Sequence, residues 1–166
     1  MKPIVTERLV LKKPFEEDKQ DLVSLLGNLE VSRFLSRVPH PYTVEDAEEW
    51  IRRIQAEEFN FSIYLDNYLI GGIGLSKTEE NSHDLGYWLG PGHWGLGYAT
   101  ESVNALLDYS FDKLDSKEIR ASVMKGNTGS INVLLKLGFK ILGEGETYSS
   151  SLKETVPCTK FFLDWS

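Results

Sequence analysis

Four glycines precede a run of helix-forming residues in the segment LGPGHWGLGYATE, residues 89–101. Gly90, Gly92 and Gly95 satisfy the spacing G-x-G-x-x-G, which dinucleotide-binding proteins use at the first turn of a βαβ unit. The segment can also be interpreted as a turn from Gly95 to Thr100 that opens a helix, where free backbone N–H groups and the helix dipole attract an anion. Both interpretations predict a bound phosphate, but in different enzymes.

The hydrophobic pattern predicts the elements that position this turn. Alternating runs predict strands, and apolar residues at a period of 3.6 predict helices. Strands are expected over residues 7–13, 59–66, 68–77, 83–89, 118–124, 140–146 and 158–165, and helices over 16–26, 29–35, 44–54, 95–111 and 130–137. This order predicts an α/β or α+β fold with a mixed sheet of about seven strands, and 166 residues suit a single domain, residues 1–166.

Two short signals sharpen this outline. Thr43 with Asp46 three residues later resembles a capping box ahead of the helix over 44–54. Asp66 and Asn67 suit a tight hairpin between two strands. Gly71, Gly72 and Gly74 in the next strand indicate a bulge or the close approach of another backbone, since they weaken a strand interior.

The elements around the glycine turn argue against a dinucleotide-binding site. That fold needs an acidic residue near the end of the second strand of the unit, to hold the ribose. Here the strand ends at Met124 and Lys125, Pro91 interrupts the glycine pattern, and strands expected to be antiparallel stand upstream. The anion-binding helix start is therefore favoured, although the turn taken alone is equally consistent with a glycine-rich helix start that binds nothing.

Composition narrows the class of partner. The net charge of −7 with scattered lysines and arginines argues against nucleic acid, and suits a cationic small molecule or peptide. A single cysteine, Cys158, excludes an internal disulfide and a zinc knuckle, and we expect no metal. With no membrane-spanning apolar run and no signal-peptide pattern at the start, we expect a cytoplasmic protein that does not enter the membrane.

Motifs along nearly the whole chain resemble the GNAT superfamily of acyl-CoA N-acyltransferases, in particular its RimJ/RimL-like branch of ribosomal-protein-alanine N-acetyltransferases. The motifs, in family order, are TERLVLK, GGIGL, GYWL, WGLGYATE and an N-x-x-S ahead of KLGF. The resemblance implies a mixed sheet with helices on both faces. That sheet splays between its fourth and fifth strands, here 83–89 and 118–123, and acyl-CoA enters the gap.

The resemblance also implies an acetyl-CoA site. The backbone of Trp88 and Leu89 would pair with the pantetheine arm like an added strand. Asn127 would reach the pantetheine from the far side, and Ser130 would lie close to the sulfur. The pyrophosphate would be held by Gly95, Leu96, Gly97, Tyr98, Ala99 and Thr100. The family often has Gln or Arg where this chain has Gly92, so we expect weaker charge support for the phosphates.

Acetyl transfer needs a neutral amine, whereas an α-amino group titrates near pH ~8 and a lysine near ~10. On the resemblance Asp84 is the expected catalytic base, with a solvated strand-end charge as the alternative. His83 is a second candidate, but strand alternation turns it to the opposite face. His93 in the turn is a phosphate contact at most. A backbone N–H near Trp88 or Leu89 would polarise the thioester carbonyl.

The leaving thiolate needs a proton. Many family members use a tyrosine in the last helix, where this chain has Leu134. We therefore expect Ser130 to be the catalytic acid, with Tyr148 as an alternative proton donor. Cys158 is expected in the core, and Arg33 and Arg37 as solvated charges.

The expected function is that of an acetyl-CoA-dependent N-acetyltransferase, acting by direct transfer in a ternary complex. Its acceptor would be a primary amine on a small molecule or at a peptide or protein N-terminus. The alternatives are a polyamine or aminoglycoside acceptor, or a CoA-binding module without catalysis that serves as a sensor. The protein is expected to be a monomer or homodimer.

Overall fold

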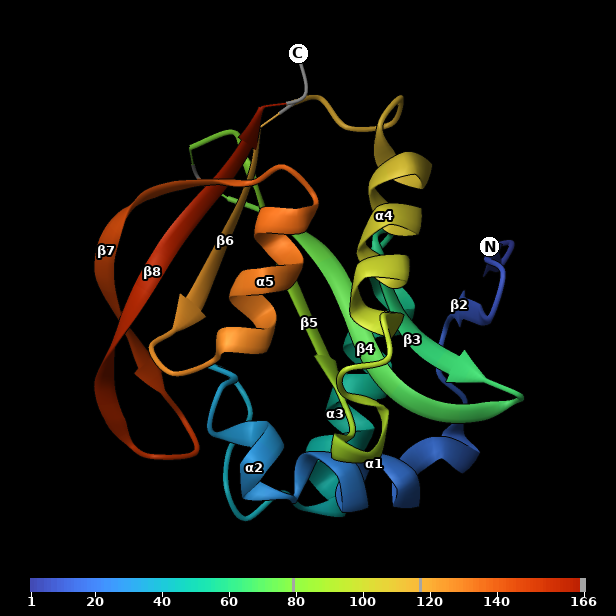
Figure 1. The fold of residues 1–166 in the computed structure, drawn as a ribbon. Helices are drawn as coiled ribbons and strands as arrows, with labels where there is room; N and C mark the ends of the chain where they lie inside the picture. Colours follow the sequence, from blue (N-terminus) through green and yellow to red (C-terminus); the bar gives the residue numbers. More distant parts are fainter. Residues whose placement is uncertain (79, 117, 165–166) are drawn as a thin grey trace.

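The computed structural model describes residues 1–78, 80–116 and 118–164, which share one central sheet with helices around it (Figure 1). The sheet has eight strands in the order β1-β2-β3-β4-β5-β6-β8-β7. Its strands are β1 (Ile4–Val5), β2 (Leu9–Lys12), β3 (Asn60–Leu65), β4 (Tyr68–Lys77), β5 (His83–Leu89), β6 (Glu118–Met124), β7 (Lys140–Ser149) and β8 (Glu154–Asp164).

The expected mixed sheet is confirmed, with one strand more than predicted. The extra strand, β1, has two residues, paired with β2 at Ile4–Leu11 and Val5–Val10. Two residues are too few to show alternation in a sequence. The last strand begins at Glu154 instead of Cys158, which lengthens the final hairpin. The predicted end of that strand at Trp165 lies outside the described residues.

The sheet opens between β5 and β6, the only parallel neighbours among the described strands. Their pairing is confined to His83–Ile119 and Asp84–Arg120, although each strand has seven residues. Beyond Asp84 the two strands separate towards their carboxyl ends, with α5 (Thr128–Lys136) beside the gap (Figure 1). The predicted splay is therefore present, between the fifth and sixth strands because β1 shifts the count.

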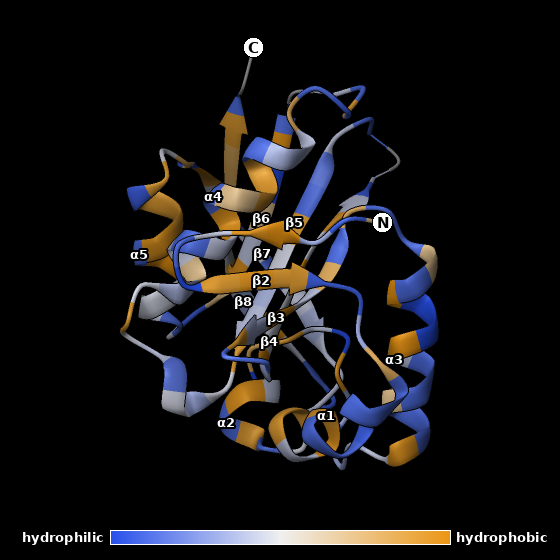
Figure 2. Ribbon diagram, turned by 90° about the vertical axis from the view of Figure 1, so that its right-hand side faces the viewer, coloured by the Kyte–Doolittle hydropathy of each residue, from blue (hydrophilic) through white to orange (hydrophobic). Residues whose placement is uncertain are grey.

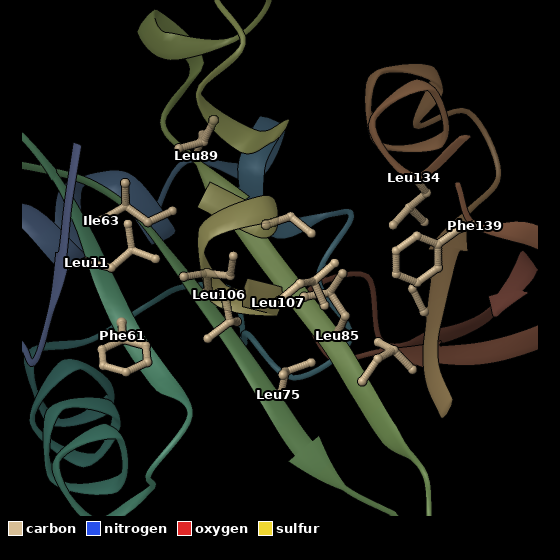
Figure 3. Packing of buried hydrophobic residues seen from close by; sticks show 14 of the residues in the cluster. Leu11, Phe61, Ile63, Leu75, Leu85, Leu89, Leu106, Leu107, Leu134 and Phe139 are labelled. Carbon is tan, nitrogen blue, oxygen red and sulfur yellow. The ribbon is translucent and has the colours of Figure 1, made fainter. Parts of the chain in front are cut away.

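Helices cover both faces of the sheet. On one face α4 (Tyr98–Ser110) and α5 share a buried cluster with the strands. Figure 3 shows Leu106 and Leu107 of α4 near Leu85 and Leu75 of the strands. The other face is covered by α1 (Lys19–Leu26), α2 (Leu29–Ser32) and α3 (Val44–Ala56). Two 3-10 turns complete the chain, η1 (Glu16–Asp18) and η2 (Pro91–His93).

The α3 helix forms because its start is capped and one face is apolar. The Thr43 hydroxyl accepts from the Asp46 N–H at 3.2 Å, and the Asp46 carboxylate accepts from the Thr43 N–H at 2.8 Å, which completes the predicted capping box. Ala47, Ile51 and Ile54 are buried at helical spacing, and Figure 2 shows α3 alternating between hydrophobic and hydrophilic residues along its length.

The other short signals are also confirmed. Asp66 and Asn67 adopt positive φ values of 49° and 69°, as a tight hairpin requires. Both expectations for the glycines of β4 are met: the β3–β4 register shifts beside Gly71, between the pairs Ile63–Gly71 and Tyr64–Leu69, and on the β5 side, where the register is continuous, the backbone approaches closely. A Cβ atom on Gly72 would lie 2.6 Å from Nε1 of Trp88, so glycine here makes room for that ring. In the described part of the chain, no helix is long and apolar enough to cross a membrane.

Candidate active site

A cleft follows the gap between β5 and β6. It has two hollows, of about 610 and 670 Å³. The first, called the glycine side below, is lined by the turn before α4 and the start of α5. The second, called the aspartate side, is lined by Asp84, Trp50 of α3 and the segment 34–38. The residues common to both hollows are Phe34, Leu35, Tyr87, Trp88, Asn127 and Ser130.

The glycine side contains the glycine-rich helix start that the sequence predicted. Gly95 and Gly97 have φ values of 73° and 84°, a region that favours glycine. Gly97 is the N-cap of α4, which begins at Tyr98, directly after the last glycine of the turn. The N–H of Glu101 makes the first helical bond, to Gly97 at 3.0 Å, so the N–H groups ahead of Glu101 have no acceptor within the helix. The lining residues include Gly95, Gly97, Tyr98, Ala99 and Thr100.

Leu96 differs from the other predicted turn residues. It is not among the residues that line the hollow, and its side chain is 52% exposed. Its carbonyl oxygen accepts a hydrogen bond from the Arg8 guanidinium at 2.9 Å. Leu96 therefore holds the shape of the turn, and only its N–H group is left for an anion.

Arg8 of the N-terminal segment braces this turn, a role that the sequence did not indicate. Its Nε lies 2.7 Å from the Glu101 carboxylate, and its guanidinium carbon lies 4.4 Å from the centre of the Tyr98 ring. The Thr6 hydroxyl also donates to Glu101, at 2.6 Å. Burial acts to raise the pKa of Glu101, but these hydrogen bonds and the charge of Arg8 more than offset it, so the pKa lies below the usual range.

Trp88 and Leu89 lie on the part of β5 that is not paired with β6. On its other side this part is paired with β4, through Gly72–Trp88 and Gly71–Leu89. The Leu89 carbonyl accepts from the Trp94 indole at 2.8 Å, so that oxygen is already used. The edge towards β6 carries no strand pairing beyond Asp84 and can accept an extended chain.

Tyr87, Asn127 and Ser130 meet where the two hollows join. The Asn127 side-chain oxygen caps α5 by accepting from the Ser130 N–H at 3.3 Å, which leaves the Asn127 amide nitrogen as a donor. The Tyr87 hydroxyl lies 2.6 Å from the Ser130 hydroxyl and donates to the Ser130 carbonyl oxygen at 3.2 Å. Burial raises the pKa of Tyr87 to about 12, against the lowering effect of the Ser130 bond, so the phenol stays protonated.

Asp84 lies on the wall of the aspartate side. Its carboxylate is reachable from solvent, yet burial by the cleft walls raises its pKa, against the lowering effect of Arg120 and Arg37. Arg120 itself forms ion pairs with Glu118, at 2.6 Å, and with Glu80. These two carboxylates weaken the lowering effect of Arg120 on the pKa of Asp84. Asp84 and Ser130 line the same hollow, so the structure brings the two predicted catalytic residues to one cleft.

The remaining candidates divide as follows. His83 is 5% exposed, lines neither hollow, and has a pKa lowered by burial. His93 lines the glycine side, and Tyr148 the aspartate side. Leu134 is fully buried, close to Phe139 (Figure 3). Cys158 is 1% exposed and lies in the core as expected.

Comparison with known proteins identifies the family. Residues 8–140 match the acetyltransferase (GNAT) domain. The chain is 31% identical to the uncharacterized N-acetyltransferase p20 of Bacillus licheniformis, over 98% of this chain and 96% of that protein. It is also 32% identical to the ribosomal-protein-serine acetyltransferase of Escherichia coli, over 50% of this chain and 48% of that protein.

A solved structure agrees with this fold. The structure of RimL, a ribosomal L7/L12 alpha-N-protein acetyltransferase in complex with coenzyme A, has a TM-score of 0.82 at 16% identity, covering 98% of each chain. The chain therefore belongs to the GNAT family of N-acetyltransferases, and its neighbours agree with the RimJ/RimL-like branch.

Proposed function

We propose that this protein transfers the acetyl group of acetyl-CoA to a primary amine, with a peptide or protein N-terminus as the favoured acceptor. The observation that carries the proposal is the junction of the two hollows at Tyr87 and Ser130, where a donor and an acceptor could meet. The names of the two ribosomal-protein acetyltransferases support an N-terminal amine as the acceptor.

The glycine side fits coenzyme A. The helix start at Gly97 offers backbone N–H groups to the pyrophosphate. On the free edge of β5, the Leu89 N–H faces the gap and is offered to the pantetheine, whereas the backbone groups of the neighbouring Trp88 face β4. The Asn127 amide is a further donor for the pantetheine. Arg33 and Lys136 also line this hollow, together with Glu30, and the two basic side chains supply positive charge in the absence of a basic residue at Gly92.

The reaction proceeds by direct attack in a ternary complex. Asp84 takes a proton from the acceptor ammonium, directly or through a water molecule, and its raised pKa suits this task. The neutral nitrogen then attacks the thioester carbonyl, whose oxygen is polarised by a backbone N–H of the β5 edge. As the new C–N bond forms, the nitrogen gives up its second proton to solvent, the C–S bond breaks, and the electron pair leaves with the CoA sulfur.

Ser130 protonates the leaving thiolate. Its hydroxyl proton passes to the sulfur, and the Tyr87 hydroxyl, 2.6 Å away, returns a proton to the serine oxygen. Tyr87 then regains a proton from solvent, and Asp84 releases to solvent the proton that it took from the acceptor. Leu134, which stands where many family members have a tyrosine, has no proton to give, so the serine and Tyr87 together take that role.

The test is thiol release from acetyl-CoA in the presence of an acceptor panel of peptides with free N-termini, polyamines and aminoglycosides. Acceptor-dependent release that is fastest with the peptides is expected. Release with polyamines or aminoglycosides alone would overturn the favoured acceptor. Saturable CoA binding without release for any member would favour the non-catalytic CoA-binding module.

A further inference from the structure

Two arginines line the aspartate side, although the chain as a whole is acidic. Arg37 follows α2, and Arg53 lies on the same α3 turn as Trp50, another lining residue. Among the described residues that line this hollow, the only other charged side chain is Asp84. The hollow therefore carries two positive charges and one negative charge.

Neither arginine is used to hold the fold together. Within the described part of the chain, Arg37 and Arg53 make no salt bridge and no side-chain hydrogen bond that fixes their guanidinium groups. By contrast, Arg52, the neighbour of Arg53, is paired with Glu49 on the outer surface of α3. Both arginines are exposed residues that line the hollow, and with 25 acidic residues in the chain, cations left unpaired along a cleft are available to a ligand.

The backbone that carries Arg37 is held in place from a distant part of the chain. At the tip of the β7–β8 hairpin, Ser150 donates to the Ser36 carbonyl from its N–H at 3.0 Å and from its hydroxyl at 2.7 Å. Ser151 donates to the Ser32 carbonyl at 3.0 Å. Arg53 is anchored in turn by the buried neighbours Ile51 and Ile54. Both guanidinium groups therefore project from fixed backbone, which lowers the entropy cost of binding a ligand.

We propose that the natural acceptor bears an anionic group, a carboxylate or a phosphate, close to its reactive amine, with the amine at Asp84 and the anion at Arg37 and Arg53. Arginine suits this role because its planar donors bind carboxylate and phosphate bidentately. The inference rests on the proposed acetyl transfer. It disfavours polyamines and aminoglycosides, because the two arginines repel a second positive charge in the acceptor.

The experiment uses matched acceptor pairs that differ only in the anion. The carboxylate arm compares Ala-Asp amide with Ala-Asn amide, and the phosphate arm compares O-phosphoethanolamine with ethanolamine. Thiol release and acceptor binding are measured for the wild type and for Arg37→Ala, Arg53→Ala and the control Arg52→Ala. Binding is followed in the presence of CoA by intrinsic tryptophan fluorescence, to which Trp50 and Trp88 of this hollow contribute.

The anionic member of at least one pair is expected to bind about tenfold more tightly than its neutral partner. Arg37→Ala and Arg53→Ala should each remove most of that preference, whereas Arg52→Ala should keep it. Equal binding within both pairs, or a preference that both cleft variants retain, would overturn the proposal. Because binding is measured separately, a preference without thiol release would contradict the acetyl transfer and leave the anion site supported.

Discussion

The hydroxyl pair of Tyr87 and Ser130 is the feature of the site with the clearest chemical meaning. The two groups come from different elements and lie 2.6 Å apart where the hollows join. Burial holds the pKa of Tyr87 at about 12, so at neutral pH the phenol is a proton donor and not a charge. A serine with a protonated partner can deliver a proton to a thiolate and regain one.

Removing the Tyr87 hydroxyl tests this coupling. Tyr87→Phe is expected to lower kcat by about tenfold, the effect of one lost hydrogen bond, with little change in the KM for acetyl-CoA. Ser130→Ala should lower kcat by about a hundredfold. In the double variant the losses should not add, because the tyrosine acts through the serine. Additive losses in steady-state kinetics would show that Tyr87 acts independently of Ser130.

The raised pKa of Asp84 has a consequence for the pH profile. A base works only when deprotonated, so kcat/KM should fall on acidification through the pKa of Asp84. Because burial raises that pKa, the fall begins at a higher pH than for an ordinary carboxylate. Asp84→Asn should remove this limb and lower kcat/KM by about a hundredfold. An unchanged acid limb in Asp84→Asn would assign the base to another group.

At the scale of elements, the turn before α4 depends on its glycines and on the brace from Arg8. Gly97 has a φ of 84°, and a Cβ atom there would lie 3.2 Å from the Arg8 guanidinium. Gly97→Ala should therefore strain the turn by about 1–2 kcal/mol and raise the KM for acetyl-CoA. Gly143→Ala is the matched control, since a Cβ atom there meets nothing within 4 Å. Equal KM values for both variants would show that the turn does not hold the donor.

Glu101 links this brace to stability. Its folded pKa lies below the unfolded value, which is about 4.3 for glutamate, so its ionised form is favoured by folding. The resulting stability is present above the unfolded pKa and is lost as the pH falls through the folded pKa. The free energy of unfolding of Glu101→Gln should be lower than that of wild type near neutral pH, and the difference should shrink in acid. A difference independent of pH in urea titrations would contradict this.

The elements also show what a sequence can predict. The α3 cap and the hairpin at Asp66 were foreseeable because their signals lie within a few residues. Residues 43 positions apart form the Tyr87–Ser130 pair, and 93 positions separate Arg8 from Glu101. Such pairs form only once the sheet has formed, so no local sequence pattern predicts them. The resemblance to a family pointed to Ser130, but it did not reveal its partner.

At the scale of the whole molecule, the sheet has two parts joined by the short β5–β6 contact. Only two residue pairs connect these strands, so residues 85–89 carry backbone groups on a free edge. Coenzyme A lying in the gap would bond to both parts. The sequence predicted this splay through the family resemblance, whereas the length of the contact, two residue pairs, is visible only in the structure.

Hydrogen exchange tests how coenzyme A occupies the gap. Amides of residues 85–89 that point towards β6 should exchange more slowly when CoA is present, because the pantetheine takes them as donors or covers them. Thermal unfolding should shift upwards in the same samples, since at about 100 times the dissociation constant a ligand adds about 2.7 kcal/mol. Stabilisation without protection on β5 would place CoA elsewhere.

The two hollows share six lining residues and are otherwise lined by different parts of the chain. Under the proposed acetyl transfer, donor and acceptor would therefore bind in either order, and the acetylated product would be able to leave while CoA is still bound. Added CoA would then compete with acetyl-CoA for the glycine side without displacing the acceptor. A molecule that joins the CoA sulfur to an acceptor amine through a short linker would fill both hollows at once.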